Sequence, residues 1–354
     1  ELGAPISYAG IISMIISGGT ILSSLMSDRL TRKLGTGRVT VISVFLTAAA
    51  LFGFSVSGSF SLLCILAVPY GLGAGAIDAA LNNYVALHYN SRQMSWLHCF
   101  WGVGVTVSPY IMSYALGANL GWRSGYRIVS VVQMLITVIL FLTLPLWKGR
   151  QSELEEEADR GEPLTIRQAL KIKGVVQVMA AFCGYCAFES ICGLWVSSYL
   201  AEYRGMDSER AASFAAFFFL GVTLGRFATG FFADRVGDKR MIRLGLCTVL
   251  AGTVLIILPV SGSVWALAGL VIVGLGAAPV YPAIIHSTPD NFGKNNSQAI
   301  IGMQMASAYV GSTFMPPLFG IIAEHISISI YPFYLAFFAA VALVASERLN
   351  KMVR

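Results

Sequence analysis

The stretch Gly230-Phe-Phe-Ala-Asp-Arg-Val-Gly-Asp-Lys-Arg240 joins two long apolar segments of the chain. We refer to it as the C-terminal motif copy. A looser version, Ser24-Leu-Met-Ser-Asp-Arg-Leu-Thr-Arg-Lys33, lies near the start of the chain and is the N-terminal motif copy. The two copies are 206 residues apart when Asp28 is matched to Asp234. Two charged connections at this spacing predict a chain built from two related halves.

The composition around these motifs is that of a membrane protein. The chain has 354 residues, of which 56% are hydrophobic and only 12% charged, and its mean hydropathy is +0.71. A soluble domain carries about 25% charged residues. Apolar runs of about 20 residues, the length that crosses a bilayer as a helix, recur between short polar connections. The alternating ten-residue segments of a membrane barrel are absent from the sequence.

The apolar runs predict an all-α membrane protein, because a helix satisfies its own backbone hydrogen bonds within the bilayer. A hydrophilic stretch, 148–173, separates five of the predicted spans from six. We predict eleven spans, at 5–27, 38–57, 61–87, 93–116, 123–147, 174–200, 208–233, 240–260, 264–288, 297–323 and 328–346.

The basic residues predict the orientation of the chain. Most of the 24 Lys and Arg residues fall in connections on one side of the predicted spans. Basic connections remain in the cytoplasm, so we expect the linker 148–173, both motif copies and the C-terminus there. Glu1 then lies outside, an arrangement that one further span before Glu1 would repair. We expect a multi-pass protein of the cell membrane, in contact with lipid, and no nucleic-acid partner.

Further landmarks support the two related halves. Gly71-Leu-Gly-Ala74 recurs as Gly274-Leu-Gly-Ala277, and Pro109 corresponds to Pro316, at spacings close to that of the motif copies. We therefore predict two pseudo-symmetric helical bundles of six spans each. The N-terminal bundle (1–147) would lack its first span, and the linker (148–173) would lead to a complete C-terminal bundle (174–354). Parallel repeats of this kind are typical of transporters with a midplane site.

The C-terminal motif copy resembles the cytoplasmic signature of the major facilitator superfamily, G-x3-D-R-x-G-x-[KR]-[KR]. The resemblance implies a major facilitator fold with about eleven of twelve helices present, and motif residues that act as a cytoplasmic gating latch. The N-terminal copy has Ser24 and Thr31 where glycines are usual, so we expect a less close helix contact there. The implied gating residues are Asp28, Arg29, Gly230, Asp234, Arg235, Gly237, Lys239 and Arg240.

Three segments resemble the fucose–proton symporter branch and its sugar-transporter-like bacterial relatives. They are 71–84, 97–109 and 185–199, which match the fourth, fifth and seventh spans of that branch. The branch ties acidic residues of its first and fourth spans to proton coupling. Asp78 occupies the fourth-span position, and the first-span partner would precede Glu1.

Acidic residues near mid-membrane are the candidates for proton coupling. Asp78 and Glu189 each lie well inside a predicted span. A charge at the bilayer centre costs about 2.5–3.5 kcal/mol on insertion scales, so such residues face a wet cavity or are protonated for part of the cycle. The alternative for each is a static hydrogen bond to a neighbouring span. Arg226 is expected to stabilise its bundle through an acidic partner, with anionic-substrate binding as the alternative.

Polar and aromatic residues inside the spans are candidates for substrate binding. Each has a structural alternative, such as a bridge between helices or a place in the interfacial aromatic belt. Tyr185 lies four residues before Glu189 and shares its helix face, and Tyr199 is expected in the belt. The substrate-binding candidates are Asn82, His98, Trp101, Tyr185, Trp195 and Gln304.

We predict a secondary active transporter that moves a small polar solute, most simply a sugar, by proton symport and alternating access. A drug or metabolite–proton antiporter is the alternative, although Ser108-Pro109 followed by Met112 departs from the antiporter signature G-x3-G-P-x2-G-G. A transport-incompetent receptor or sensor is a further alternative. The sequence carries no catalytic set, cofactor motif or metal set, and we expect a monomer that is not an enzyme.

Overall fold

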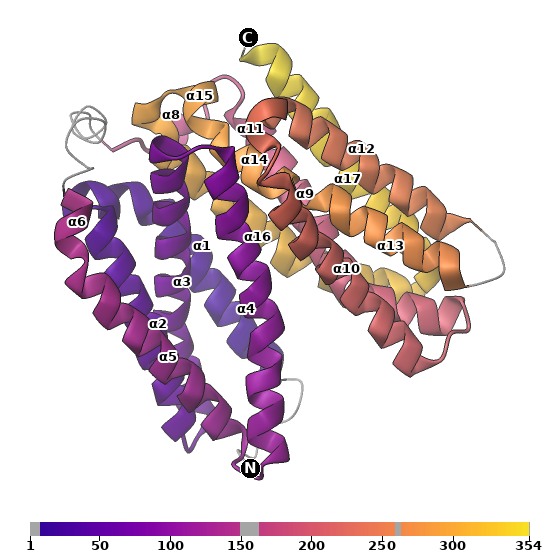
Figure 1. Ribbon diagram of the computed structural model, residues 1–354, viewed down its shortest axis with the longest axis horizontal. Coiled ribbons are helices and arrows are strands. Elements are labelled where there is room, and N and C mark those ends of the chain that lie inside the picture. Colours follow the sequence, from indigo (N-terminus) through magenta and orange to yellow (C-terminus); the bar gives the residue numbers. More distant parts are fainter. Residues whose placement is uncertain (1–7, 149–162, 259–262, 354) are drawn as a thin grey trace. The chain divides into compact units, whose positions relative to one another are not determined.

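The computed structural model describes residues 8–148, 163–258 and 263–353, and every regular element among them is a helix (Figure 1). Eleven segments of these residues are long and apolar enough to cross a membrane, which confirms the predicted all-α membrane fold. The spanning helices are α1 (Ala9–Leu34), α2 (Thr36–Val56), α3 (Phe60–His88), α4 (Ser91–Gly117), α5 (Trp122–Leu142), α9 (Val175–Ser198), α10 (Ser208–Thr229), α12 (Asp238–Ile257), α13 (Ser263–Ala277), α16 (Lys294–His325) and α17 (Tyr331–Met352).

Shorter helices complete or connect these spans. The π-helical turn η2 (Tyr199–Tyr203) extends α9, and α14 (Val280–His286) continues the span that α13 begins. Part of the predicted linker, 149–162 with its acidic run, lies outside the described residues. The other short helices are α6 (Leu144–Lys148), α8 (Ile166–Ala169), α11 (Ala233–Val236), α15 (Thr288–Phe292) and the 3-10 helix η3 (Ile328–Ile330).

The turn after each motif copy has the same backbone. Gly35 has φ 78° and ψ 150°, and Gly237 has φ 81° and ψ 148°. This region is open almost only to glycine. Each turn is followed at once by a helix, α2 or α12. The turn comes three residues after Asp234 but seven residues after Asp28, so the N-terminal copy contains about one more turn of helix.

The chain divides into two compact units, which are described separately. Unit 1 comprises Glu1–Leu87, Val103–Ala169 and Gly293–Ala306, and unit 2 comprises His88–Gly102, Leu170–Phe292 and Ser307–Arg354. Two helices are shared. The first part of α4 belongs to unit 2 and the first part of α16 to unit 1, so each unit takes in a helix start from the other half of the sequence. The predicted bundle boundaries stay a prediction.

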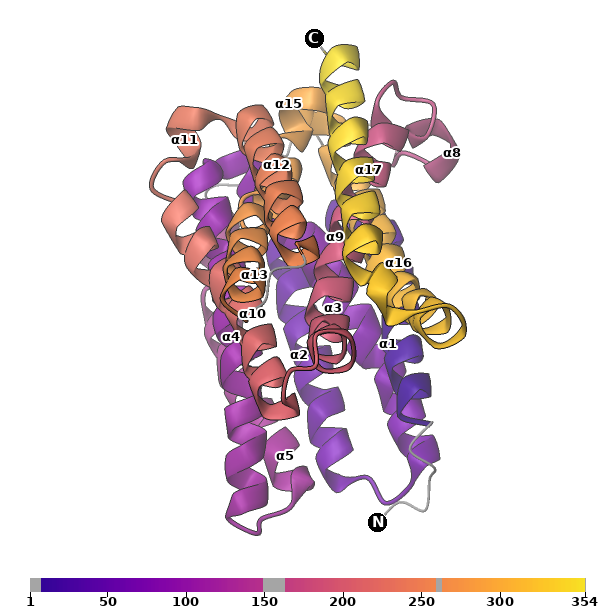
Figure 2. The ribbon, with the colours of Figure 1, turned by 90° about the vertical axis from the view of Figure 1, so that its right-hand side faces the viewer.

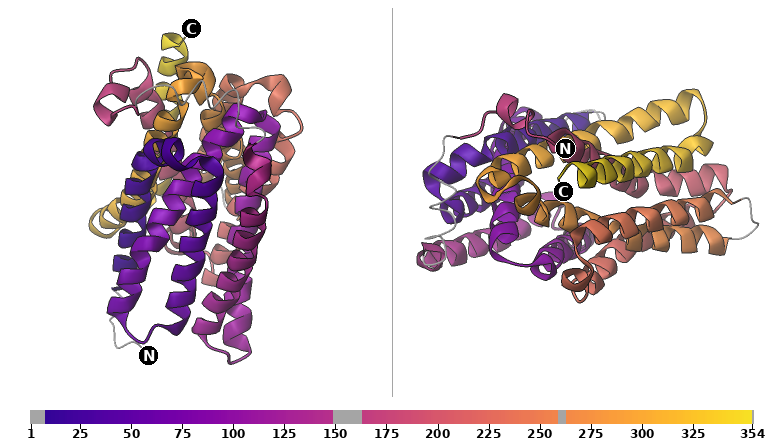
Figure 3. Two further views of the ribbon diagram at one scale, coloured as in Figure 1. Left: turned by 90° about the vertical axis from the view of Figure 1, so that its left-hand side faces the viewer. Right: turned by 90° about the horizontal axis from the view of Figure 1, so that it is seen from above.

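Unit 1 is built from α1, α2, α3, α5, the end of α4 and the start of α16, and in the left-hand view of Figure 3 the helices from α1 to α5 run from indigo to magenta. Leu51, Phe54, Leu63 and Ala67 form a buried apolar cluster between α2 and α3. Small residues bring the helices close together. A Cβ on Gly75 of α3 would overlap the Thr20 carbonyl oxygen of α1, so these two helix backbones are in direct contact.

Unit 2 is built from α9, α10, α12, α13, α14 and α17 with the start of α4 and the end of α16. Figure 2 shows α10, α12, α13 and α17 of this unit. Helix α12 packs along α13 and α17, and α9 packs along α17. The core is aromatic, since the buried tyrosines Tyr185, Tyr199 and Tyr331 are each at most 1% exposed. Of these tyrosines, Tyr185 also contacts Arg226.

Candidate transport site and motif contacts

An ion pair joins α9 to α10 inside unit 2. Nη2 of Arg226 lies 3.1 Å from Oε1 of Glu189. Only 3% of the Arg226 side chain and 13% of the Glu189 side chain are exposed. Transfer of both charges out of water is costly, and their pairing offsets part of that cost. Glu189 is thus the acidic partner of Arg226. It makes the hydrogen bond to a neighbouring span that was the structural alternative for this residue.

Tyr185 extends this pair to a third helix. Nη2 of Arg226 lies 3.4 Å from the Tyr185 hydroxyl, which donates to the carbonyl of Ala277 in α13 at 3.1 Å. Tyr185 and Glu189 are four residues apart on α9 and share a face, as their spacing indicates. One face of α9 therefore presents both an acidic and a phenolic group to Arg226.

Aromatic rings from α4 and α14 lie against the guanidinium. Cζ of Arg226 is 5.1 Å from the ring centre of Trp101 and 5.9 Å from that of Tyr281, within the range of cation–π attraction. The ring of His98 lies 4.5 Å from that of Tyr281, and the His98 carbonyl accepts from Nη1 of Arg226 at 3.5 Å. His98 is buried, whereas Trp101 is 48% exposed. Trp101 is therefore the accessible aromatic face of the cluster.

Tyr281 is a member of the cluster that the sequence does not single out. It lies just after Pro279, where one span breaks into α13 and α14. A break in a spanning helix is a known position for binding residues, because the backbone there no longer satisfies itself. The signal that could have identified Tyr281 is therefore a proline in mid-span followed by an aromatic residue with a polar tip.

One nitrogen of the Arg226 guanidinium makes no hydrogen bond to the described residues. Nε of Arg226 is buried and has no hydrogen-bond partner among the residues that the structure describes. The five N–H donors of a guanidinium form a planar fork that matches a carboxylate or phosphate. We call Tyr185, Glu189, Arg226, Trp101 and Tyr281 the arginine cluster. It combines a fixed cation, a titratable carboxylate and an exposed indole ring, which suits a polar or anionic solute.

Asp78 and Asn82 lie on α3 in unit 1 and contact each other. The Asn82 amide donates to Oδ1 of Asp78 and to the Asp78 carbonyl oxygen, both at 2.8 Å. Asn82 is buried, and Asp78 is partly exposed. The predicted one-turn spacing therefore brings the amide to the carboxylate of its own helix. Their roles in coupling and substrate binding stay predictions.

Trp195 and Gln304 occupy other positions. Nε1 of Trp195 donates to the carbonyl of Pro316 at 3.0 Å and ties α9 to α16 within unit 2. Gln304 is fully buried on the part of α16 that belongs to unit 1. The expectation that Tyr199 lies in the interfacial belt is wrong. Tyr199 is 1% exposed, because its ring stacks with Tyr203 and packs against Tyr331.

The C-terminal motif copy contacts the start of α4 inside unit 2. Oδ1 of Asp234 accepts from the backbone N–H of Arg92 at 3.2 Å, and Oδ2 accepts from the Asn90 side chain at 3.2 Å. A carboxylate at a helix N-terminus satisfies free N–H groups and meets the positive end of the helix dipole. Gly230 faces the indole of Trp96 on α4. The basic residues Arg235, Lys239 and Arg240 are exposed.

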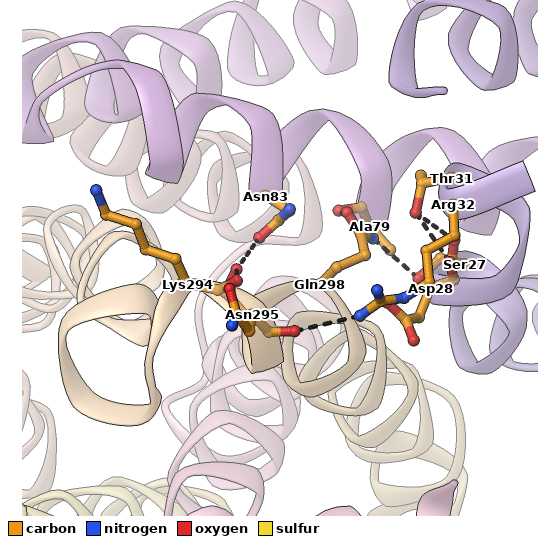
Figure 4. Close-up of polar contacts among 10 residues, drawn as sticks. Ser27, Asp28, Thr31, Arg32, Ala79, Asn83, Lys294, Asn295 and Gln298 are labelled. Carbon is orange, nitrogen blue, oxygen red and sulfur yellow. Dashed lines mark hydrogen bonds and ion pairs between the residues drawn. The ribbon is translucent and has the colours of Figure 1, made fainter. Parts of the chain in front are cut away.

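The N-terminal motif copy contacts the start of α16 inside unit 1 (Figure 4). Oδ1 of Asp28 lies 3.0 Å from Nε of Arg32, four residues later on α1. Nη2 of Arg32 then donates to the carbonyl of Asn295 at 3.3 Å. Gln298 of α16 donates to Ser27 at 3.1 Å. Asp28 is thus linked to α16 through Arg32, while Arg29 is exposed.

The expectation of a less close helix contact at the N-terminal copy is wrong. A Cβ on Gly302 of α16 would overlap the backbone carbonyl oxygen of Ser24 on α1. The two backbones are therefore in direct contact even though Ser24 replaces the usual glycine. The small residue lies on the partner helix instead, which the motif itself does not cover.

The family of the chain follows from its sequence as well as from these helices. The sequence profile of the Major Facilitator Superfamily matches residues 1–217 and 178–349, so the chain belongs to this superfamily of transporters. The crystal structure of the E. coli fucose:proton symporter is similar in fold, with a TM-score of 0.78 over 97% of this chain and 90% of that chain. The two sequences are 16% identical, so this likeness concerns the fold.

Several relatives of this chain carry names that state what they transport. The cis,cis-muconate transport protein of Acinetobacter baylyi is 22% identical over 243 residues, which cover 65% of this chain and 58% of that protein. The chain thus spans less than two thirds of the length of that relative. The hexuronate transporter of Bacillus subtilis is 25% identical over 363 residues, which cover 94% of this chain and 82% of that protein.

Proposed function

We propose that this transporter carries a small organic anion, such as a sugar acid, together with a proton. The observation that carries the proposal is the buried Arg226, whose charge is matched by Glu189 and whose Nε–H has no partner among the described residues. Muconate and hexuronate, the substrates in the names of two relatives, are both carboxylates. A carboxylate fits the fork of a guanidinium better than a neutral hydroxyl does.

The ion pair provides the coupling between proton and anion. With Glu189 ionised, the pair is neutral and Arg226 is already occupied. A proton on Glu189 leaves Arg226 as a buried charge without a counter-ion, and such a charge is strongly destabilising. A substrate carboxylate removes this penalty by taking the place of Glu189. Proton and anion therefore bind better together than either does alone.

Trp101, Tyr185 and Tyr281 supply the remaining contacts in this proposal. The exposed indole of Trp101 offers a flat apolar surface to the carbon side of a sugar ring or of a conjugated chain. The hydroxyl of Tyr185 moves between its Ala277 acceptor and a substrate oxygen. Tyr281 and His98 keep the guanidinium in position through ring and carbonyl contacts.

A transport assay separates an anion from a neutral solute by charge. One proton carried with a monoanion moves no net charge, so a pH gradient drives uptake and a membrane potential alone does not. One proton carried with a neutral sugar moves one charge, for which a potential of 100 mV supplies about 2.3 kcal/mol. We would compare D-glucuronate with D-glucose in proteoliposomes, since the two differ mainly in one carboxylate.

The expected result is glucuronate uptake driven by a pH gradient, up to about tenfold accumulation per pH unit, and none driven by a potential alone. Glucose uptake driven by a potential would contradict the anion proposal and support sugar symport. Uptake of neither solute under any gradient would favour the receptor alternative, and uptake driven by a reversed pH gradient would favour the antiporter.

Substitutions in the ion pair test the two roles. Glu189→Gln should abolish proton-driven accumulation but retain exchange of labelled for unlabelled substrate, because glutamine mimics the protonated acid. Arg226→Lys should retain the charge but weaken binding by about tenfold or more, since an ammonium lacks the bidentate fork. Accumulation that survives Glu189→Gln would remove Glu189 from the coupling mechanism.

A neutral sugar carried by proton symport is the second candidate. The similar fold of the fucose:proton symporter and the exposed ring of Trp101 favour it. In either case we propose that Asp78, with Asn82, is a further proton-coupling group in unit 1. Asp78→Asn should then shift the pH dependence of accumulation, whereas a purely structural Asp78 would leave that dependence unchanged.

We also propose that the two motif copies are gating latches on the cytoplasmic side of the cell membrane. Their contacts to the starts of α4 and α16 support this role, because each ties a helix start to a motif copy from the other half of the sequence. The distribution of Lys and Arg supports a cytoplasmic linker and C-terminus. The transport cycle would release and re-form these contacts in a monomeric carrier.

A further inference from the structure

A second titratable cluster lies at the end of unit 2 where α12 begins, among residues separate from the arginine cluster. Nδ1 of His286, the last residue of α14, lies 2.6 Å from Oδ2 of Asp238, the first residue of α12. Ser91, the first residue of α4, donates to Oδ1 of Asp238 at 2.6 Å and lies 3.0 Å from Nδ1 of His286. Nε2 of His286 lies 3.1 Å from the carbonyl oxygen of Tyr89.

A neutral histidine, a neutral serine and an ionised aspartate together carry one proton too few to satisfy all of these contacts. The Tyr89 carbonyl only accepts, so Nε2 of His286 holds a hydrogen. The Ser91 hydrogen is directed at Oδ1 of Asp238. A further proton must then lie between Nδ1 of His286 and Oδ2 of Asp238, because a short contact between two bare acceptors is repulsive. The Asp238–His286 pair thus holds a proton whichever of its two atoms carries it.

The surroundings favour a bound proton at this position. The His286 side chain is 17% exposed and that of Asp238 is 12% exposed, so their interaction is only partly screened by water. The charged groups that act on the ring are Asp238 from α12 and Asp290 from α15, and both are acidic. The ring also contacts the carbonyl of Tyr89, which lies between α3 and α4, and the hydroxyl of Ser91, the first residue of α4. Burial of the ring disfavours its charged form, and the two carboxylates and two neutral acceptors act against that cost.

We propose that the Asp238–His286 pair is a second proton-binding site, and that its proton stabilises the contacts of the start of α4 with α12 and α14. In the protonated state, His286 bonds to Asp238 and Tyr89 at the same time. When the proton is lost, the His286 ring has one N–H hydrogen for two acceptors, so its hydrogen bond to either Asp238 or Tyr89 opens. The links are complete at low pH and weaken as the pH rises through the titration of the pair. Asp234 holds the neighbouring Arg92 amide, so this proton adjusts a junction that the motif also contacts.

Histidine NMR and hydrogen exchange test the site in the full-length protein. With ¹⁵N-labelled histidine, His286 should show both ring nitrogens protonated at pH 7, identified by loss of the signal in His286→Gln. Backbone amides of residues 89–96 should exchange about tenfold faster once the pair is deprotonated, the size expected for one lost charge-assisted hydrogen bond. Exchange rates would be corrected for the intrinsic effect of pH.

Two variants serve as references for this measurement. His286→Gln should remove the pH dependence of exchange in residues 89–96, because glutamine does not titrate. His325→Gln changes an exposed histidine at the end of α16 and should leave that dependence as in the parent protein. A neutral His286 ring at pH 7 in the parent protein, or exchange of residues 89–96 that does not depend on pH, would overturn the proposal whether or not either variant folds.

Discussion

The two motif copies reach close helix contact in opposite ways. In the C-terminal copy, Gly230 supplies the space and Trp96 of α4 fills it. In the N-terminal copy, Ser24 takes the glycine position and Gly302 of α16 supplies the space. Both pairs of equivalent positions, 24 with 230 and 96 with 302, are 206 apart. Close approach of two helices depends on a pair of residues, one on each helix, so a motif on one helix specifies only one member of the pair.

The acidic residues of the two copies differ as well. Asp234 is exposed and bonds directly to the start of α4. Asp28 is 4% exposed, pairs with Arg32 on its own helix and reaches α16 through that arginine. The extra helical turn before Gly35 explains the difference, because it keeps Arg32 on α1 one turn beyond Asp28. The equivalent aspartates thus contact the partner helix directly in the C-terminal copy and through an arginine in the N-terminal copy.

The largest difference between the copies is expected for alanine at the two space-giving glycines. Gly302→Ala places a methyl group against a backbone oxygen, which no rotamer change can relieve, and we expect a loss of about 1–3 kcal/mol of stability. Gly230→Ala meets the side chain of Trp96, which can move, so its loss should be smaller. Thermal unfolding of the purified protein in detergent measures both.

A rescue experiment sharpens this prediction. Trp96→Ala should relieve most of the loss caused by Gly230→Ala in a double-mutant cycle. Gly104→Ala on α4 is the matched control, because no atom lies within 4 Å of the added methyl group, and it should cost nothing. Equal losses at Gly302 and Gly230, with no coupling to Trp96, would contradict the exchange of small and large residues between the copies.

A moderate difference is expected when each acid is neutralised. Asp28→Asn leaves the partly buried Arg32 without its carboxylate and should cost about 1.5–3 kcal/mol, the value of a hydrogen bond to a charged group. Asp234→Asn keeps an oxygen for the Arg92 amide, and its new amide nitrogen can donate to the Asn90 side-chain oxygen once that amide flips. The loss is then mainly that of a charge at a helix N-terminus, about 0.3–1 kcal/mol. Urea or thermal unfolding at one ionic strength gives the two values.

Salt provides the check on this second prediction. The cost of Asp234→Asn should fall at high ionic strength, because the carboxylate is exposed and screened. The cost of Asp28→Asn should change less, and Arg32→Gln added to Asp28→Asn should recover part of the stability by removing the partly buried arginine charge. A larger and salt-sensitive cost at Asp28 would show that the relayed contact through Arg32 does not hold in solution.

The smallest difference is expected at the turn glycines. Gly35→Ala and Gly237→Ala each force a side chain into the same unfavourable backbone region, at about 1–3 kcal/mol. Because the φ and ψ values of the two turns agree within a few degrees, the two costs should agree within about 0.5 kcal/mol, the usual limit of additivity. Unequal costs, measured by thermal unfolding, would mean that the two turns differ in solution.

The spans were predictable because hydropathy alone requires helices in a bilayer. Tyr185 and Glu189 were placed on one face by their spacing of four, and both contact Arg226. The identity of the acid beside Arg226 depends on how α9 and α10 rotate about their axes, which hydropathy does not encode. Tyr281 was missed for the same reason, since it reaches Arg226 only after the helix breaks near Pro279.

The N-terminal motif copy was the least predictable part. Matching Asp28 to Asp234 places Thr31 at the glycine position, but the turn is made by Gly35. Because of the inserted helical turn, the charged residues of the two copies align at one spacing along the chain. The glycines that make the following tight turn align at a different spacing. Gly302, which restores the close contact, lies in a segment that the motif does not include.

The position of these partners along the chain sets the order in which the protein is assembled during synthesis. Arg92 precedes Asp234 by 142 residues, so the C-terminal copy finds its partner already made. Asn295 follows Arg32 by 263 residues, an interval of roughly 13–53 s at the usual rates of translation, about 5–20 residues per second. Asp28 and Ser27 are therefore synthesised long before α16 exists. Of the two motif copies, the N-terminal one closes later in a newly made molecule, and truncation before α16 leaves it open.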